Sequence, residues 1–129
     1  MQRLALYRQG HCLLADVSHA RRWHQRARGL LLRAPLQPGQ GLLIEPCASV
    51  HTCFMGYALD LVFLDRGNRV LGWREHLPPW RAAGLRGAHA TLELPAGSLI
   101  GLGLQIGQTL YWQPSPPAPP TDATDMETP

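Results

Sequence analysis

One aspartate lies inside an apolar run that is typical of a buried strand. In LDLVFL, residues 59–64, Asp60 has large aliphatic residues on both sides. Because strand side chains alternate between two faces, Asp60 shares a face with Val62 and Leu64, and apolar residues on both faces predict a central strand. An unpaired carboxylate is costly to bury there. Asp60 therefore needs a partner. If Asp60 is a structural anchor, the partner is a backbone N–H or an arginine such as Arg28. If Asp60 belongs to a binding site, the partner is a ligand.

Two cysteines and a histidine precede this run. The alternation of VHTCF places His51 and Cys53 on one face, and Cys47 lies four residues before His51. Two thiolates and an imidazole are ligands that Zn²⁺ accepts, so these residues could bind a metal ion. They could also form a catalytic group, with Cys47 or Cys53 as the nucleophile, His51 as the base and Asp60 as the orienting group. No CxxC pair and no second histidine at helical spacing accompany them. Cysteines packed as small apolar residues are the simpler interpretation, and no cofactor is expected.

The elements that must position these residues are mostly strands. RLALYR and CLLADV predict two strands around a turn at Gln9 and Gly10, and DRGN, residues 65–68, predicts a hairpin turn between 59–64 and 70–77. From Ser18 to Leu30 apolar residues recur at steps of three and four, which predicts one amphipathic helix of about four turns. A short second helix is expected after Pro95. The pattern predicts a mainly β fold with little helix.

Length and composition predict one folded domain and a tail. The chain has 129 residues, of which 45% are hydrophobic, enough for a single core. Residues 113–129, QPSPPAPPTDATDMETP, are rich in proline and acids and have almost no large apolar side chains, so they cannot offset the entropy of ordering. We predict a single mainly β domain over residues 1–112 and a disordered, Pro-rich, acidic tail over residues 113–129.

The basic charge of the chain comes from arginine alone. The formal net charge is +3, and three of the nine acidic residues lie in the tail, which leaves 12 arginines against six acids before it, a net charge of +6. Nucleic-acid binding requires basic residues gathered on one face with aromatic or motif support. Only five of these arginines are close together in sequence, at residues 21–33. Compositional bias explains the arginines better, and we expect no nucleic-acid partner.

No segment predicts export or a membrane span. The number of cysteines is odd, and the N-terminal apolar patch is interrupted by Arg8 and His11, which makes it too short for a signal peptide. Residues 94–112 are uncharged, but Pro95 and four glycines make this segment a poor membrane-spanning helix. A cytoplasmic protein with reduced thiols is the expectation.

Four segments of the chain carry a family resemblance. RARGLLLR, GQGLLIEPCASVHTCFM, LDLVFLDRGNRVLGW and ATLELPAG follow one another in an order that resembles the bacterial and archaeal family catalogued as domain of unknown function 192, over about residues 20–112. The most specific elements are residues 28–30, the cluster of His51, Thr52 and Met55, Asp60, and residues 93–97. The resemblance implies a compact jelly-roll or barrel-like antiparallel sheet with one N-terminal helix and a short second helix. It implies no known activity.

The resemblance also suggests a site. It implies that a characteristic surface or pocket is formed by Arg28, His51, Thr52, Met55 and Asp60. We therefore predict a binding or accessory module for an unknown small molecule or protein, in which Arg28 reaches Asp60 or a bound anion. Two alternatives remain open: a thiol- or metal-dependent enzyme that uses Cys47, His51 and Cys53, and an interaction module recognised through its Pro-rich tail.

Overall fold

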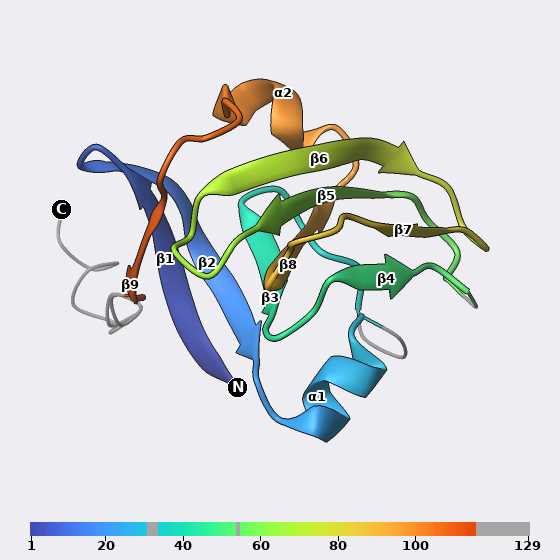
Figure 1. The fold of residues 1–129 in the computed structure, drawn as a ribbon. Helices are drawn as coiled ribbons and strands as arrows, with labels where there is room; N and C mark the ends of the chain where they lie inside the picture. The colour runs from blue at the N-terminus through green and yellow to red at the C-terminus, as the bar shows by residue number, and fades with distance from the viewer. Residues whose placement is uncertain (31–33, 54, 116–129) are drawn as a thin grey trace, which may run out of the picture.

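A computed structural model describes residues 1–30, 34–53 and 55–115 of the chain. In these ranges the chain forms nine strands and two short helices (Figure 1). The elements in chain order are β1 (Gln2–Arg8), β2 (His11–Ala20), α1 (Trp23–Arg28), β3 (Gln40–Ile44), β4 (Ser49–His51), β5 (Leu59–Leu64), β6 (Val70–Leu77), β7 (Ala82–Gly84), β8 (Ala90–Pro95), α2 (Ser98–Leu102) and β9 (Tyr111–Pro114). The predicted mainly β fold with two short helices is confirmed.

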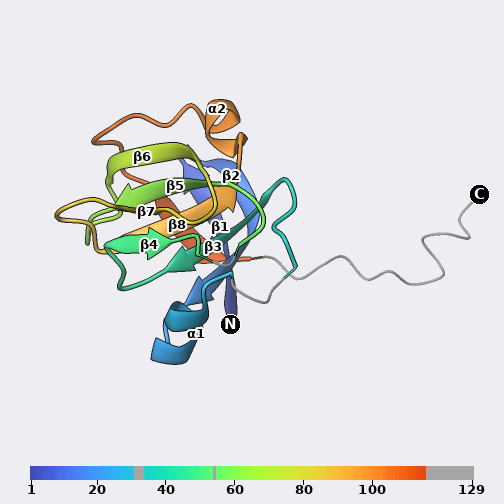
Figure 2. The same cartoon turned by 90° about the vertical axis from the view of Figure 1, so that its right-hand side faces the viewer.

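Seven of the strands form one large sheet. Their order is β6-β5-β8-β3-β2-β1-β9, while β4 and β7 pair separately. The sheet is mixed rather than wholly antiparallel, because β2 and β3 run parallel. Parallel neighbours need a crossover connection, and the segment that contains α1 supplies it. In both ribbon views α1 lies beyond one end of the sheet and α2 at the opposite end (Figures 1 and 2).

The large sheet curls without closing into a barrel. No strand ladder joins β6 to β9 in the described residues, but the segment before β9 contacts the start of β6. The amide of Val70 donates to the carbonyl of Gln108 at 2.9 Å, and the amide of Gly107 donates to the carbonyl of Val70 at 2.7 Å. The described strands thus make one open, curled sheet and a two-stranded ribbon, unlike the two four-stranded sheets of a jelly roll.

The two predicted hairpin turns are present. Gln9 and Gly10 have φ values of 48° and 81° between β1 and β2, the positive values that a tight hairpin turn requires. In the DRGN turn, the Asp65 carboxylate accepts hydrogen bonds from the amides of Gly67 (2.8 Å) and Arg69 (2.9 Å). β5 and β6 are antiparallel, as predicted. Local turn chemistry was therefore enough to identify both hairpins.

The predicted four-turn helix was wrong in its start and length. α1 has only six residues, Trp23–Arg28, and residues 18–20 belong to β2. Ser18 pairs with Arg3 of β1 on one side and with Leu42 of β3 on the other. Strand pairing on both edges satisfies the backbone there, and this tertiary arrangement outweighs the helical spacing of the apolar residues.

The C-terminal boundary also differs from the expected one. Gln113 and Pro114, assigned to the tail by composition, belong to β9 and pair with Ala5 and Leu4. The Ser115 amide donates to the carbonyl of Arg3 at 3.0 Å. The rest of the predicted tail, residues 116–129, lies outside the described residues.

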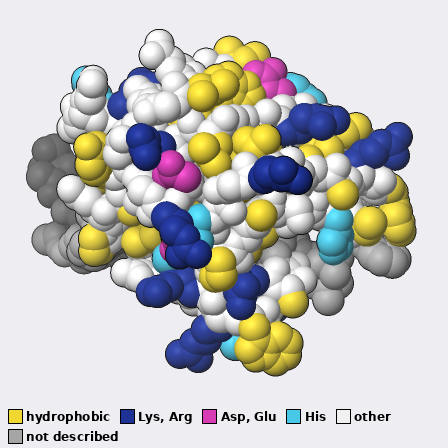
Figure 3. Space-filling model, in the orientation of Figure 1, with side chains coloured by type: hydrophobic (Ala, Val, Ile, Leu, Met, Phe, Trp, Pro, Cys, Tyr) yellow, Lys and Arg dark blue, Asp and Glu magenta, His cyan; other side chains and the backbone are white. Residues whose placement is uncertain are grey.

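The arginines are spread over the surface. In Figure 3 several arginine side chains lie on the lower part of the face shown, where Figure 1 places α1, and others are scattered above them. In the described part of the chain, no helix is long and apolar enough to cross a membrane. The cytoplasmic location stays a prediction.

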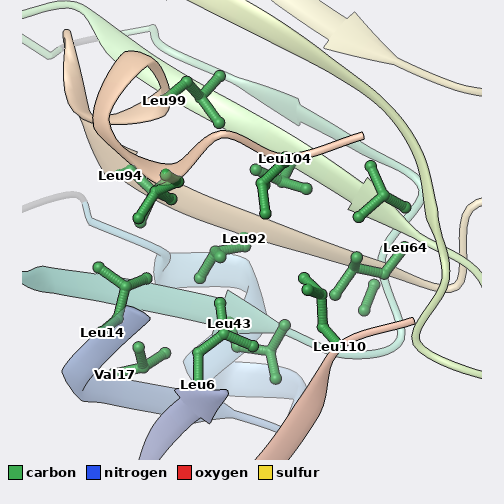
Figure 4. Packing of buried hydrophobic residues seen from close by; sticks show 14 of the residues in the cluster. Leu6, Leu14, Val17, Leu43, Leu64, Leu92, Leu94, Leu99, Leu104 and Leu110 are labelled. Carbon is green, nitrogen blue, oxygen red and sulfur yellow. The ribbon is translucent and has the colours of Figure 1, made fainter. Parts of the chain in front are cut away.

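The sheet has an apolar core on each face. The first core cluster packs leucines of β1, β2, β3, β5 and β8 against Leu99 and Leu102 of α2 (Figure 4). The second core cluster lies on the opposite face and joins Leu42, Ile44, Leu59, Leu61 and Phe63 to the β4–β7 ribbon and to Leu30 after α1. Because both faces of β5 and β8 are covered, all residues of β5 and nearly all of β8 are buried. Polar side chains on these two strands therefore need a specific explanation.

Candidate functional site

Asp60 is completely buried, and its partners are backbone amides. One carboxylate oxygen accepts a hydrogen bond from His76 N (2.8 Å), and the other accepts from Gly97 N and Leu99 N (3.0 Å each). Asp60 thus ties β5 to the irregular end of β6, where His76 has a φ of 50°, and to the start of α2. The expected pairing with Arg28 is not formed. These contacts support the structural interpretation of Asp60.

Thr52 is also buried and fixes a turn. Its hydroxyl donates to the carbonyl of Pro78 (2.6 Å) and accepts from the amide of Arg81 (3.0 Å). Its carbonyl accepts from the amide of Trp80 at 3.0 Å, and Trp80 has a φ of 63°, a left-handed conformation that bulky residues rarely adopt. Thr52 therefore supports the segment between β6 and β7.

The other three candidate residues line one cavity. This cavity of about 240 Å³ lies between the end of α1, the segment that carries β4, and β8, and we call it the Glu93 cavity. It is lined by residues 26–30, Ile44, Cys47, residues 49–51, Cys53, Met55 and Glu93. The sequence candidates Arg28, His51 and Met55 are therefore brought together, whereas Thr52 and Asp60 are not among the lining residues.

Glu93 is the functional candidate that residue-by-residue reasoning missed. It lies on β8 between Leu42 of β3 and Leu61 of β5, and it is only 4% exposed. A Cβ on Gly29 would lie 3.7 Å from its Oε1, so the carboxyl group lies against the end of α1. The only available signal was the family resemblance, which included residues 93–97. In ATLELP alone, Glu93 alternates with leucines like any outward-facing strand residue.

Burial governs the protonation of the Glu93 carboxyl group. Among the described residues it accepts no hydrogen bond, and burial raises its pKa to about 8. At neutral pH it is therefore mostly a neutral carboxylic acid, which can donate a proton in a hydrogen bond. Burial and the nearby charge of Glu93 also raise the pKa of Tyr57.

Two further polar atoms are buried without a hydrogen-bond partner in the described part of the chain, one on a lining residue and one on a residue outside the lining. They are the Nε of Arg26, which belongs to a lining residue, and the hydroxyl of Tyr57. Arg26 uses Nη1 to donate to the carbonyl of Pro46 at 3.3 Å. Nδ1 of His19 and Nε1 of Trp112 are also buried without a partner in the described residues and belong to residues outside the lining, so this feature is not confined to the cavity.

Cys47, His51 and Cys53 line the cavity as well, and local hydrogen bonds engage Cys47 and His51. The Cys47 thiol donates to the carbonyl of Ser49 at 3.0 Å, and Nδ1 of His51 accepts from the amide of Cys53 at 3.3 Å. Within residues 1–30, 34–53 and 55–115, no group of three His, Cys, Asp or Glu residues is arranged to hold a metal ion.

Comparisons with known proteins identify relatives over most of the chain. Residues 5–112 match the profile of the domain of unknown function 192 family, described as "Uncharacterized ACR". A UPF0127 protein of Pyrococcus furiosus is 30% identical over 110 residues, which cover 81% of this chain and 92% of that protein. A UPF0127 protein of Thermococcus sibiricus is 27% identical over 110 residues, which cover 81% of this chain and 71% of that protein.

Two crystal structures share the fold. A protein of unknown function from Novosphingobium aromaticivorans has a TM-score of 0.73 at 21% identity, with 85% of this chain and 84% of that chain covered. A proposed transcription regulator from Sinorhizobium meliloti has a TM-score of 0.72 at 24% identity, with 86% of this chain and 92% of that chain covered. At these identities the likeness concerns the fold alone.

Proposed function

Because the chain belongs to the uncharacterised domain of unknown function 192 family, we propose a function from its own site: the protein is a binding module that holds a small ligand in the Glu93 cavity. Arg28, His51 and Met55 are the ligand-contacting residues among the sequence candidates. Thr52 acts indirectly, because it holds the turn that packs beside His51 and Cys53, whereas Asp60 stabilises the opposite face of the sheet.

The observation that carries this proposal is the buried carboxyl group of Glu93 at the cavity, for which no side-chain hydrogen bond is formed within residues 1–30, 34–53 and 55–115. Burying a polar group without a hydrogen bond destabilises a protein by roughly 1–3 kcal/mol. The neighbours Leu42 and Leu61 provide an apolar wall in which a leucine would pack better. A group that lowers stability, titrates at a shifted pH and opens to a cavity is typical of a functional site.

A binding experiment with a blocked cavity tests the proposal. Small-molecule fragments that are anionic, cationic or neutral are titrated into the protein and followed by NMR. Ala27 is exposed and lines the cavity, so Ala27→Trp should fill its mouth, whereas Ala15→Trp adds the same side chain to an exposed position of β2 outside the lining. We expect at least one fragment whose binding is lost in A27W and kept in A15W. Fragments that bind equally to both variants would place the binding site elsewhere.

The alternative of a thiol- or metal-dependent enzyme is supported by one observation. Cys47, His51 and Cys53 all line the same cavity. Metal analysis of protein purified without a histidine tag tests the metal form, and stoichiometric zinc would favour it. The alternative in which the Pro-rich tail is recognised by a protein stays a prediction, since residues 116–129 lie outside the described residues.

A further inference from the structure

We infer that the Glu93 cavity binds a small organic acid, with the ligand carboxylate among Arg26, His51 and Glu93 and its apolar part against the aliphatic wall. The inference rests on the proposed function, because it names the ligand class for the same site. It follows from the hydrogen-bonding character of the polar groups at the cavity, from the apolar remainder of the lining, and from the cavity's size.

The first donor is Arg26. Its Nε–H is buried and has no hydrogen-bond partner among the described residues, while its Nη1 is held by the carbonyl of Pro46. A guanidinium has five N–H donors and no acceptor, and its geometry suits a carboxylate. Arg28 adds a second guanidinium to the same lining. A ligand with acceptor atoms and a negative charge matches this wall.

The second donor is His51. Its Nδ1 accepts a hydrogen bond from the Cys53 amide at 3.3 Å, so the neutral ring carries its proton on Nε2. His51 lines the cavity and can therefore donate through Nε2–H.

The third donor is Glu93 in its neutral form. Because burial raises its pKa to about 8, it has an O–H group to donate at neutral pH, and it has no negative charge to attract an amine. Arg26, His51 and Glu93 all line the cavity, and each side chain carries a hydrogen-bond donor. A carboxylate can accept from each of them, whereas an ammonium group can accept from none.

The remaining lining and the volume indicate an apolar body of modest size. Leu30, Ile44, Val50 and Met55 supply aliphatic surface. The cavity of about 240 Å³ holds on the order of eight water-sized groups, since one water occupies about 30 Å³ in the liquid. Hexanoate and benzoate are acids of this size, and inorganic phosphate would leave the aliphatic wall uncovered.

Ionisation of Glu93 should control this binding. Above pH 8 a second negative charge would face the ligand carboxylate, so affinity should fall about tenfold for each further pH unit. Other titratable or charged groups around Glu93 are Arg26 and Arg28 at α1, His51 on β4, the thiols of Cys47 and Cys53, and Tyr57. A guanidinium stays charged throughout this range, whereas thiols can also ionise and repel an anion. A variant is needed to separate these contributions.

Calorimetric titration with hexanoate at pH 7 and pH 9 tests the inference, with hexylamine, hexanamide and phosphate as comparison ligands. We expect hexanoate to bind best at pH 7 and about tenfold more weakly at pH 9. Glu93→Gln keeps an N–H donor but does not ionise, so its affinity for hexanoate should fall much less than tenfold between the two pH values. Arg26→Leu should weaken binding, whereas Arg86→Leu, at an exposed position outside the lining, should not.

The outcomes separate the ligand class from the site itself. Tighter binding of hexylamine or phosphate than of hexanoate, or a full tenfold pH dependence that persists in E93Q, would overturn the organic-acid inference and leave the binding site intact. Carboxyl ¹³C NMR of the wild-type protein gives a test without any variant: hexanoate should raise the pH at which Glu93 titrates. If no probe of any charge moves the Glu93 resonance, the organic-acid inference and the proposed function both fail.

Discussion

The Asp60 hydrogen bonds allow a sharp prediction for the stability of the fold. Asp60→Asn keeps the size of the side chain but leaves one oxygen and one NH₂ group where two carboxylate oxygens now accept three amide hydrogen bonds. If the remaining oxygen accepts from Gly97 and Leu99, the new NH₂ group faces the N–H of His76, and two donors oppose each other. One charge-assisted hydrogen bond is lost, a buried donor is left unpaired, and the other two bonds become neutral.

The magnitude follows from these losses. A hydrogen bond to a charged group contributes about 1.5–3 kcal/mol, and a buried unpaired donor costs about 1–3 kcal/mol. We therefore expect Asp60→Asn to lower the free energy of unfolding by about 3–5 kcal/mol, a large part of the roughly 5–15 kcal/mol typical of a small domain. Asp60→Ala leaves three amides unpaired and should prevent stable folding.

Urea denaturation followed by tryptophan fluorescence measures this loss. Asp16→Asn is the matched control, because Asp16 is only partly buried and pairs with Arg3 at the surface, so its replacement should cost much less. Amide hydrogen exchange at Leu99 should accelerate in D60N and stay unchanged in D16N. A loss below about 1 kcal/mol in D60N, together with unchanged exchange at Leu99, would refute the view that Asp60 anchors α2.

Three further predictions concern other parts of the molecule. Burial raises the pKa of Glu93 from 4.5 to about 8. As the pH rises between these two values, the free energy of unfolding of the wild-type protein should therefore fall by up to about 1.4 kcal/mol per pH unit. Glu93→Gln should show no such fall in urea titrations at pH 5, 6.5 and 8. Thr52→Val removes the hydroxyl hydrogen bonds to the Pro78–Arg81 turn and should lower the free energy of unfolding by about 1–3 kcal/mol. The Arg81 amide should also exchange its hydrogen faster. An unchanged exchange rate at Arg81 would contradict the role of Thr52 in this turn. Removing residues 116–129 should leave the urea midpoint of unfolding unchanged, whereas removing residues 113–129 should lower it because β9 loses its last pairs with β1. Equal midpoints for the two truncated proteins would support the domain boundary at residue 112 that composition predicts.

Part of the site was accessible from the sequence because it depends on local patterns and on family motifs. Arg28, His51 and Met55 were expected to lie together, and all three line the Glu93 cavity. The β5–β6 hairpin followed from alternation and from the DRGN turn, whose hydrogen bonds form within five residues, 65–69. Such features require no knowledge of distant contacts.

Other parts of the site depend on which segments pack on which face of the sheet. Asp60 and Glu93 are both acids in apolar strands, yet Asp60 meets amides 16, 37 and 39 residues away, whereas Glu93 opens to a cavity on the opposite side. Likewise, Ser18–Ala20 have helical spacing but extend β2, because β1 and β3 flank them.

By itself, the sequence determined that a buried carboxylate in this chain must have a partner, since burial without one is costly in any fold. It also determined the family and the mainly β architecture, and three of its five ligand-binding candidates, Arg28, His51 and Met55, line the cavity. Only the tertiary structure decided that backbone amides satisfy Asp60 and that Glu93 lines a cavity. The physical reason is that alternation assigns a side chain to one of two faces but does not say what covers that face.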